Sequence, residues 1–103
     1  MIPEALIEEA ARRFALLGDP SRLRILSTLN ESGELAVGEL AALSGLTRTN
    51  LSQHLSRLAA AGLVGRRRQG TTIYYRIVDE SLGELCNLVC ASLRERGRAL
   101  AAS

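Results

Sequence analysis

The chain has 103 residues, of which 47% are apolar, so it can bury one hydrophobic core but not two. Its apolar runs are too short to span a membrane, no basic leader indicates a signal peptide, and two cysteines are too few for a secreted disulfide scaffold. We therefore expect a single cytoplasmic domain covering residues 1–103.

The net charge of +2 conceals an uneven distribution of charge along the chain. Residues 46–76 contain six arginines and no acidic residue, which gives this segment a charge of +6. The other residues hold seven arginines against eleven acidic residues, a charge of −4. Such a division within one small domain indicates a surface for a polyanion, although a solvated basic face without a partner would have the same composition.

Two helices are expected before residue 33. Pro3 and Gly18 suit the start and end of the first, and apolar residues recur between them at helical spacing: Leu6, Ile7, Ala10, Phe14 and Leu17. Asp19 caps the second helix and Pro20 takes its first position. Its buried stripe is expected to be Leu23, Leu26 and Leu29, and the breaker cluster at residues 30–33 ends it.

The middle of the chain predicts a short strand and two further helices. A residue or two of strand is expected at Leu35, followed by a short helix over residues 39–44 that ends at Gly45. Thr47 caps the next helix, and Gly62 lies past its end. The inward residues of that helix are expected to be Leu51, Leu55 and Leu58.

After residue 62 the apolar pattern changes from helical to alternating. The segment LVGRRRQGTTIYYRIV carries β-branched and aromatic residues around a Gln69–Gly70 turn, which predicts a β-hairpin. A last helix is expected from Asp79 or Ser81 to about Arg96. The predicted fold is therefore mainly α with a small β-hairpin (α+β), made of five helices and a wing of two or three strands.

Two short helices joined at Gly45 and followed by an arginine-rich hairpin are typical of a winged helix-turn-helix. With its leucines buried, the second of these helices presents short hydrogen-bonding side chains outward. Those candidates for DNA contact are Thr49, Ser52, Gln53 and Ser56. Flanking arginines suit phosphates, and hairpin arginines suit a neighbouring groove or backbone: Arg48 and Arg57, then Arg66, Arg67 and Arg68.

His54 lies beside the leucine stripe rather than on the outward face. We expect it to be a packed or phosphate-contacting residue and not a metal ligand. Neither a partner acid, a nucleophile dyad nor a glycine-rich phosphate loop accompanies it. The sequence therefore predicts no catalytic residue, no enzyme activity and no required cofactor.

Three stretches of the chain resemble the ArsR/SmtB family of bacterial repressors in order and spacing: LLGDPSRLRILSTL, ELAVGELAALSGLTRTNLSQHLSRLAAAGLV and RRQGTTIYYRI. The resemblance implies a homodimeric winged helix whose first and last helices, about residues 4–17 and 81–97, form the dimer interface. It also implies binding to imperfect inverted repeats in double-stranded DNA, and release by an inducer. A winged helix that docks a protein partner remains the alternative.

The sensor sites that this resemblance implies are incomplete here. Arsenic- and cadmium-type members carry a Cys-Val-Cys-like element where residues 36–38 read Ala-Val-Gly. The four zinc-type positions keep both carboxylates but neither histidine: Asp79, Ser81, Ser92 and Glu95. Persulfide-type members pair a cysteine in the second helix with one in the last, and here Ser27 is the nearest substitute for the former.

Cys86 and Cys90 lie four residues apart in the last helix, beside an apolar stripe of Leu82, Leu85, Val89 and Leu93. We expect Cys86 to be mostly buried and Cys90 to be more accessible. Their Cβ atoms should be about 5–6 Å apart, whereas a disulfide needs about 3.5–4.5 Å. Three interpretations remain open: two small interface hydrophobes, a metal clamp for a thiophilic inducer such as arsenite or another soft metal, or a redox or persulfide switch.

Overall fold

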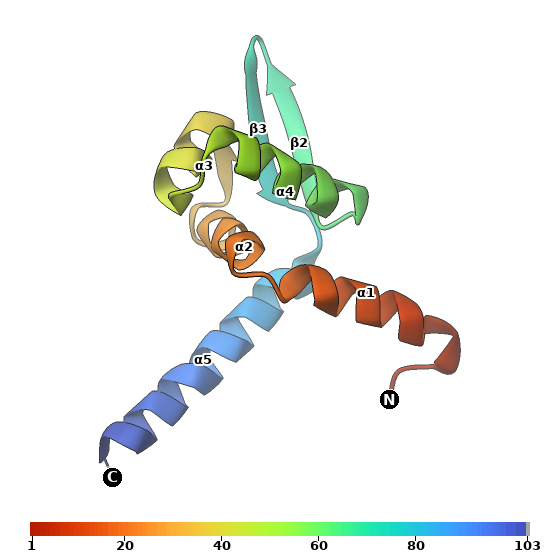
Figure 1. Cartoon of the computed structure of the whole chain (residues 1–103), viewed down its shortest axis with the longest axis vertical. Helices are drawn as coiled ribbons and strands as arrows, with labels where there is room; N and C mark the ends of the chain where they lie inside the picture. Colours follow the sequence, from red (N-terminus) through yellow and green to blue (C-terminus); the bar gives the residue numbers. More distant parts are fainter. Residues whose placement is uncertain (103) are drawn as a thin grey trace.

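The computed structural model describes residues 1–102 and contains five α-helices and three strands within that range (Figure 1). After a 3-10 helix at Glu4–Leu6, the elements are α1 Ile7–Leu17, α2 Pro20–Ser32, β1 Glu34–Ala36, α3 Val37–Ser44, α4 Arg48–Ala60, β2 Val64–Gln69, β3 Thr72–Ile77 and α5 Glu80–Ala102. Helices α3 and α4 form the helix-turn-helix, and the strands form the wing. The predicted fold class is confirmed.

The helix caps that the sequence predicts are present. Asp19 Oδ2 accepts a hydrogen bond from Arg22 N at 2.9 Å, and Thr47 Oγ1 accepts one from Asn50 N at 3.2 Å. Each bond satisfies a backbone N–H group that the start of a helix leaves unpaired. Gly45 has a φ of +73°, a left-handed conformation that glycine adopts readily, and this lets the chain turn tightly between α3 and α4.

The three strands form an antiparallel sheet in the order β1-β3-β2. Gln69 pairs with Thr72, so the hairpin loop is residues 70–71, one residue beyond the predicted turn. Gly70 has a φ of +63° and occupies the first central position of this loop, where tight hairpins favour glycine. β1 pairs with the other edge of β3, which confirms the short strand predicted around Leu35.

The core beneath the sheet consists mainly of leucine side chains. The predicted inward residues of α4, Leu51, Leu55 and Leu58, are each at most 1% exposed. The prediction for α2 was wrong at one position, since Leu23 is 44% exposed and Ile25 is fully buried. At about 100° per residue, the spacing of residues 25, 26 and 29 places them on one narrow arc, and residue 23 lies outside it.

Three helices are longer than predicted. α3 begins at Val37, two residues before its predicted start. α2 continues past Leu29 to Ser32 and ends where Gly33 adopts a φ of +85°. α5 continues past Arg96 to Ala102. No breaker residue interrupts the segment beyond Arg96 except Gly97, and a single glycine costs a helix only about 1 kcal/mol.

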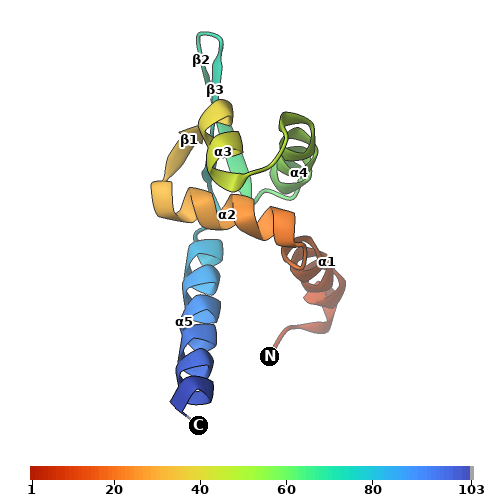
Figure 2. The same ribbon diagram turned by 60° about the vertical axis from the view of Figure 1, so that its left-hand side comes forward.

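α1 and α5 extend from the body on the side opposite the tip of the wing (Figures 1 and 2). Large apolar side chains on these two helices and on the 3-10 helix before α1 are exposed: Leu6, Ile7, Phe14, Leu88, Val89, Leu93 and Leu100. Exposed apolar faces of this kind mark interaction surfaces. Among residues 1–102, no helix combines the length and apolar character needed to cross a membrane.

Candidate nucleic-acid interface

The outer face of α4 carries the polar residues that the sequence assigned to it. With the leucines of α4 packed inward, the opposite face is exposed to solvent, and it comprises Thr49, Ser52, Gln53 and Ser56. A helix whose exposed face offers hydroxyl and amide groups near its N-terminus matches the donors and acceptors of DNA base edges in the major groove. The geometry therefore presents these four side chains together.

Arg48 and Arg57 lie at opposite ends of this polar face, and both are exposed. Arg48 also packs back on the preceding helix, since a Cβ placed on Gly38 would lie 3.4 Å from Arg48 Nη2. The Arg48 guanidinium therefore lies beside Gly38 in the first turn of α3. Arg57 lies in the last turn of α4.

The three consecutive wing arginines do not share one face, because side chains alternate along a strand. Arg66 lies opposite Tyr75 and Arg68 opposite Ile73, on the face of the sheet that covers the core. Arg67 lies opposite Tyr74 on the outer face, where its guanidinium pairs with Glu34 of β1. The sequence treats the three residues as equivalent, whereas the structure separates Arg67 from the other two.

His54 is partly buried at the side of α4, as the sequence indicated. Its Nδ1 atom is buried and has no hydrogen-bond partner within residues 1–102. His54 lies near Asp19, the cap of α2. The pKa of Asp19 is lowered mainly by the hydrogen bond from Arg22 N, and to a smaller extent by the charge of His54. The described residues contain no group of three or more metal-ligating side chains.

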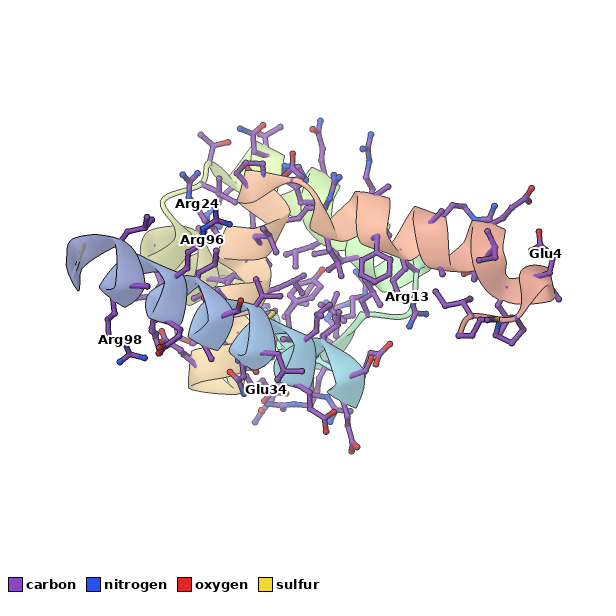
Figure 3. The ribbon with its side chains drawn as sticks, turned by 90° about the horizontal axis from the view of Figure 1, so that it is seen from below. Glu4, Arg13, Arg24, Glu34, Arg96 and Arg98 are labelled. Carbon is purple, nitrogen blue, oxygen red and sulfur yellow. The ribbon has the colours of Figure 1, made fainter. Side chains whose placement is uncertain are left out.

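The carboxylates at the zinc-type positions already have partners. Asp79 Oδ2 accepts a hydrogen bond from Arg13 Nη1 at 2.7 Å (Arg13 is labelled in Figure 3), and Asp79 Oδ1 accepts from Ser81 Oγ at 2.6 Å. Hydrogen bonds from Ser81 and the charge of Arg13 lower the pKa of Asp79. Glu95 pairs with Arg98 at 2.8 Å. Asp79 therefore joins α1 to the start of α5, which is a structural role.

Cys86 is partly buried and Cys90 is exposed, in the order that the sequence predicted. Burial raises the pKa of the Cys86 thiol, and the neighbouring Cys90 raises it further. Because the thiolate is the reactive form, a raised pKa lowers the fraction of Cys86 that is reactive at neutral pH. Cys90 is thus the more accessible of the two sulfurs.

A contact that the sequence analysis missed joins the thiol-bearing face of α5 to the end of α2. Asn30 Nδ2 donates a hydrogen bond to Asn87 Oδ1 at 3.3 Å. A Cβ on Gly83 would lie 2.9 Å from Asn30 Oδ1, so the glycine permits this close approach. At about 100° per residue, residues 83, 86, 87 and 90 fall within an arc of about 100° and so share one face of α5. Asn30 and Asn87 are 57 positions apart, and no pattern in the sequence indicates that they meet.

Comparison with known proteins adds independent information on this interface. The family description "Bacterial regulatory protein, arsR family" matches residues 19–65, which include α2, α3, α4 and the start of β2. An HTH-type transcriptional regulator of Methanocaldococcus jannaschii is 39% identical over 82 residues, covering 80% of this chain and 92% of that protein. Three other relatives are longer, and the matches span 37% to 55% of their length.

Solved structures resemble the whole arrangement of helices and strands. The antimony-specific transcriptional repressor AntR superposes with a TM-score of 0.86 at 34% identity, covering 95% of this chain and 88% of AntR. A homodimeric winged helix-turn-helix DNA-binding domain from Mycobacterium bovis, a fragment of residues 1–100, superposes with a TM-score of 0.79 at 39% identity. The matched regions cover 89% of this chain and 84% of that domain.

Proposed function

Because the chain belongs to the arsR family of bacterial regulatory proteins, we propose that two copies form a repressor that binds an inverted-repeat operator in double-stranded DNA. Members of this family are DNA-binding transcriptional regulators and not enzymes. The observation that carries the proposal is the exposed polar face of α4 beside the arginine-rich hairpin of β2 and β3, whose two strands contain no acidic residue. Since its proposed partner is double-stranded DNA, we place the protein in the cytoplasm.

Within this proposal the residues of α4 divide into two groups. Gln53 and its polar neighbours contact base edges, where a good bidentate contact discriminates against a wrong base by about 1–3 kcal/mol. Arg48 and Arg57 bind phosphates, which fix the position of the helix without reading sequence. The homodimer found for the Mycobacterium bovis domain supports two recognition helices on one operator, with half-sites about one helical turn apart.

A Gln53→Ala protein is expected to lose preference for its operator, because the amide that reads a base edge is removed. The ratio of operator to random-DNA affinity should fall about tenfold or more for each half-site. Arg57→Ala is the matched control, and it should weaken binding to all sequences alike and flatten the salt dependence. Fluorescence anisotropy with operator and random DNA measures these affinities. Equal losses of affinity for the two variants on both DNAs would refute the division into base-reading and phosphate-binding residues.

We further propose that Cys86 and Cys90 adjust operator affinity through a thiophilic ion or through oxidation or persulfide formation. The similarity to an antimony-specific repressor supports a soft metalloid as the inducer. The exposed position of Cys90 allows such an inducer to reach the pair. The Asn30–Asn87 contact, on the same face of α5, offers a direct route from the thiols to α2. A purely structural role for both cysteines is the competing interpretation.

A Cys86→Ser, Cys90→Ser protein is expected to bind the operator as the unmodified protein does but to lose its response to inducer. An allosteric coupling of about 1–3 kcal/mol corresponds to a change in affinity of about 5- to 150-fold. Reduced protein should be titrated with operator in the presence of antimonite, arsenite, zinc, peroxide or persulfide, and mass spectrometry should identify modified sulfurs. Ser92→Ala in the same helix serves as the control. A double variant that still responds to every inducer would exclude the two thiols as the groups that sense it.

A further inference from the structure

Arg67 belongs to a bridge that spans all three strands of the wing. Its Nη2 atom donates to Glu34 Oε1 at 2.6 Å, and its Nε atom donates to Glu34 Oε2 at 3.3 Å. Its Nη1 atom donates to Gln69 Oε1 at 2.8 Å, and the guanidinium lies 4.5 Å from the ring centre of Tyr74. The bridge therefore joins β2 to β1 across the central strand β3.

The register of the sheet explains why these residues meet. Glu34 pairs with Arg76 and Arg67 pairs with Tyr74, and side chains of paired residues project to the same face of a sheet. That face is the outer one, because the opposite face carries the buried Leu35 and Tyr75. Arg67 and Glu34 thus meet over Tyr74 on the side away from the core.

The contact with Glu34 has the geometry of a strong, specific ion pair. Two N–H groups of one guanidinium bind the two oxygens of one carboxylate, an arrangement that fixes orientation as well as distance. The pKa of Glu34 is lowered, chiefly by the hydrogen bond from Arg67, which shows that the pair favours the ionised carboxylate. The side chains are 48% and 32% exposed, so the pair is accessible but not free.

Arg66 and Arg68 differ from Arg67 in both direction and pairing. They project to the opposite face of β2, the face that packs on α4 and the core. Arg68 Nε donates to the carbonyl of Gly70 at 3.0 Å, and neither arginine forms an ion pair with any acidic residue of the described chain. Their positive charges are therefore not neutralised.

We infer that Arg67 is a positioning residue, anchored by Glu34, that fixes the wing relative to the helix-turn-helix, while Arg66 and Arg68 make the wing's phosphate contacts. This inference rests on the proposed DNA-binding function. A guanidinium that already faces a carboxylate adds almost no net charge at the DNA surface, so it releases few counterions. β1 leads directly into α3, so a bond from the wing to Glu34 sets the angle between the wing and the recognition element.

Salt dependence of operator binding distinguishes a positioning arginine from a phosphate-binding one. The slope of log K against log salt concentration changes by about 0.9 for each phosphate contact, hence by about 1.8 for a dimer that loses one contact in each chain. Arg68→Ala should flatten the slope by about this amount. The double variant Glu34→Gln, Arg67→Ala removes both charges of the pair, so it should weaken binding by the same factor at every salt concentration and leave the slope unchanged. A flattening by this double variant equal to that of Arg68→Ala would overturn the inference.

Glu34→Gln supplies a second test, a change in the salt slope that would not occur if the Arg67–Glu34 bridge only stabilised the fold. The variant removes the carboxylate but keeps the shape of the side chain, so Arg67 gains an unneutralised charge beside the DNA and the salt slope should steepen. Adding Arg67→Ala to Glu34→Gln should abolish that steepening. Glu31→Gln, which removes the same charge outside the bridge, is the control. An unchanged slope in Glu34→Gln would also overturn the inference.

The same titrations separate this inference from the proposed function. If the unsubstituted protein shows no salt-dependent affinity for duplex DNA, the proposed function fails and this inference fails with it. If that protein binds DNA and only the slopes of the Arg67 and Glu34 variants disagree with expectation, the proposed function stands and the positioning role is rejected. Circular dichroism melting of each variant verifies that it is folded at the temperature of the titration.

Discussion

A Leu93→Glu protein is expected to be monomeric and to lose most of its affinity for an inverted-repeat operator. Leu93 is 62% exposed on α5, and a groove of about 320 Å³ between α1 and α5 is lined by apolar side chains that include the exposed Phe14 and Leu88. If a second chain covers this surface, a glutamate there is buried without a partner, and the two copies bring like charges together. A monomer then binds one half-site at a time, and linked binding contributes about 10²- to 10⁴-fold.

Sedimentation and operator titration test this expectation together. Ala91→Glu is the matched control, because residue 91 is exposed and lies about 200° around the same helix from residue 93. The control should remain dimeric and keep its operator affinity. A Leu93→Glu protein that sediments as a dimer and binds the operator normally would place the dimer interface outside this face of α5.

The sequence alone predicted the parts of the fold that depend on local chemistry. Asp19 and Thr47 were identified as caps because a short polar side chain beside the first helical residues can accept from a free backbone N–H. The leucine stripe of α4 followed from its spacing, and the outward polar face followed from the stripe. Both belong to the helix-turn-helix, so most of the candidate interface was visible before the structure was known.

Features that depend on distant contacts were not predicted correctly. Leu23 was placed in the core because its spacing fits a stripe, but the position of the sheet and of α4 decides which arc of α2 is covered. Strand register decides which of Arg66 and Arg67 faces the core, and Glu34 meets Arg67 only because β1 and β2 flank the same strand. Asn30, Gly83 and Asn87 likewise meet through helix packing.

A Leu55→Ala protein is expected to lose about 2–5 kcal/mol of unfolding free energy, the usual cost of removing a buried leucine. Leu55 is 1% exposed and lies in the middle of the inward stripe of α4. Its loss leaves a cavity directly beneath the recognition helix. Domains of this size have a total stability of about 5–15 kcal/mol, so one substitution removes a large share.

Ser56 is adjacent to Leu55, and Ser56→Ala should instead leave the stability nearly unchanged and weaken operator binding. Ser56 is exposed on the outward face, so its unfolding free energy should change by no more than about 0.5 kcal/mol while operator affinity falls. Urea unfolding at one fixed chain concentration compares the variants, because the stability of a dimer depends on concentration. A Leu55→Ala protein that loses less than about 1 kcal/mol would contradict the packing of α4. The contrast between these neighbours follows from the angle of about 100° between them around the helix: residue 55 faces the core, and residue 56 lies on the face that we propose contacts DNA.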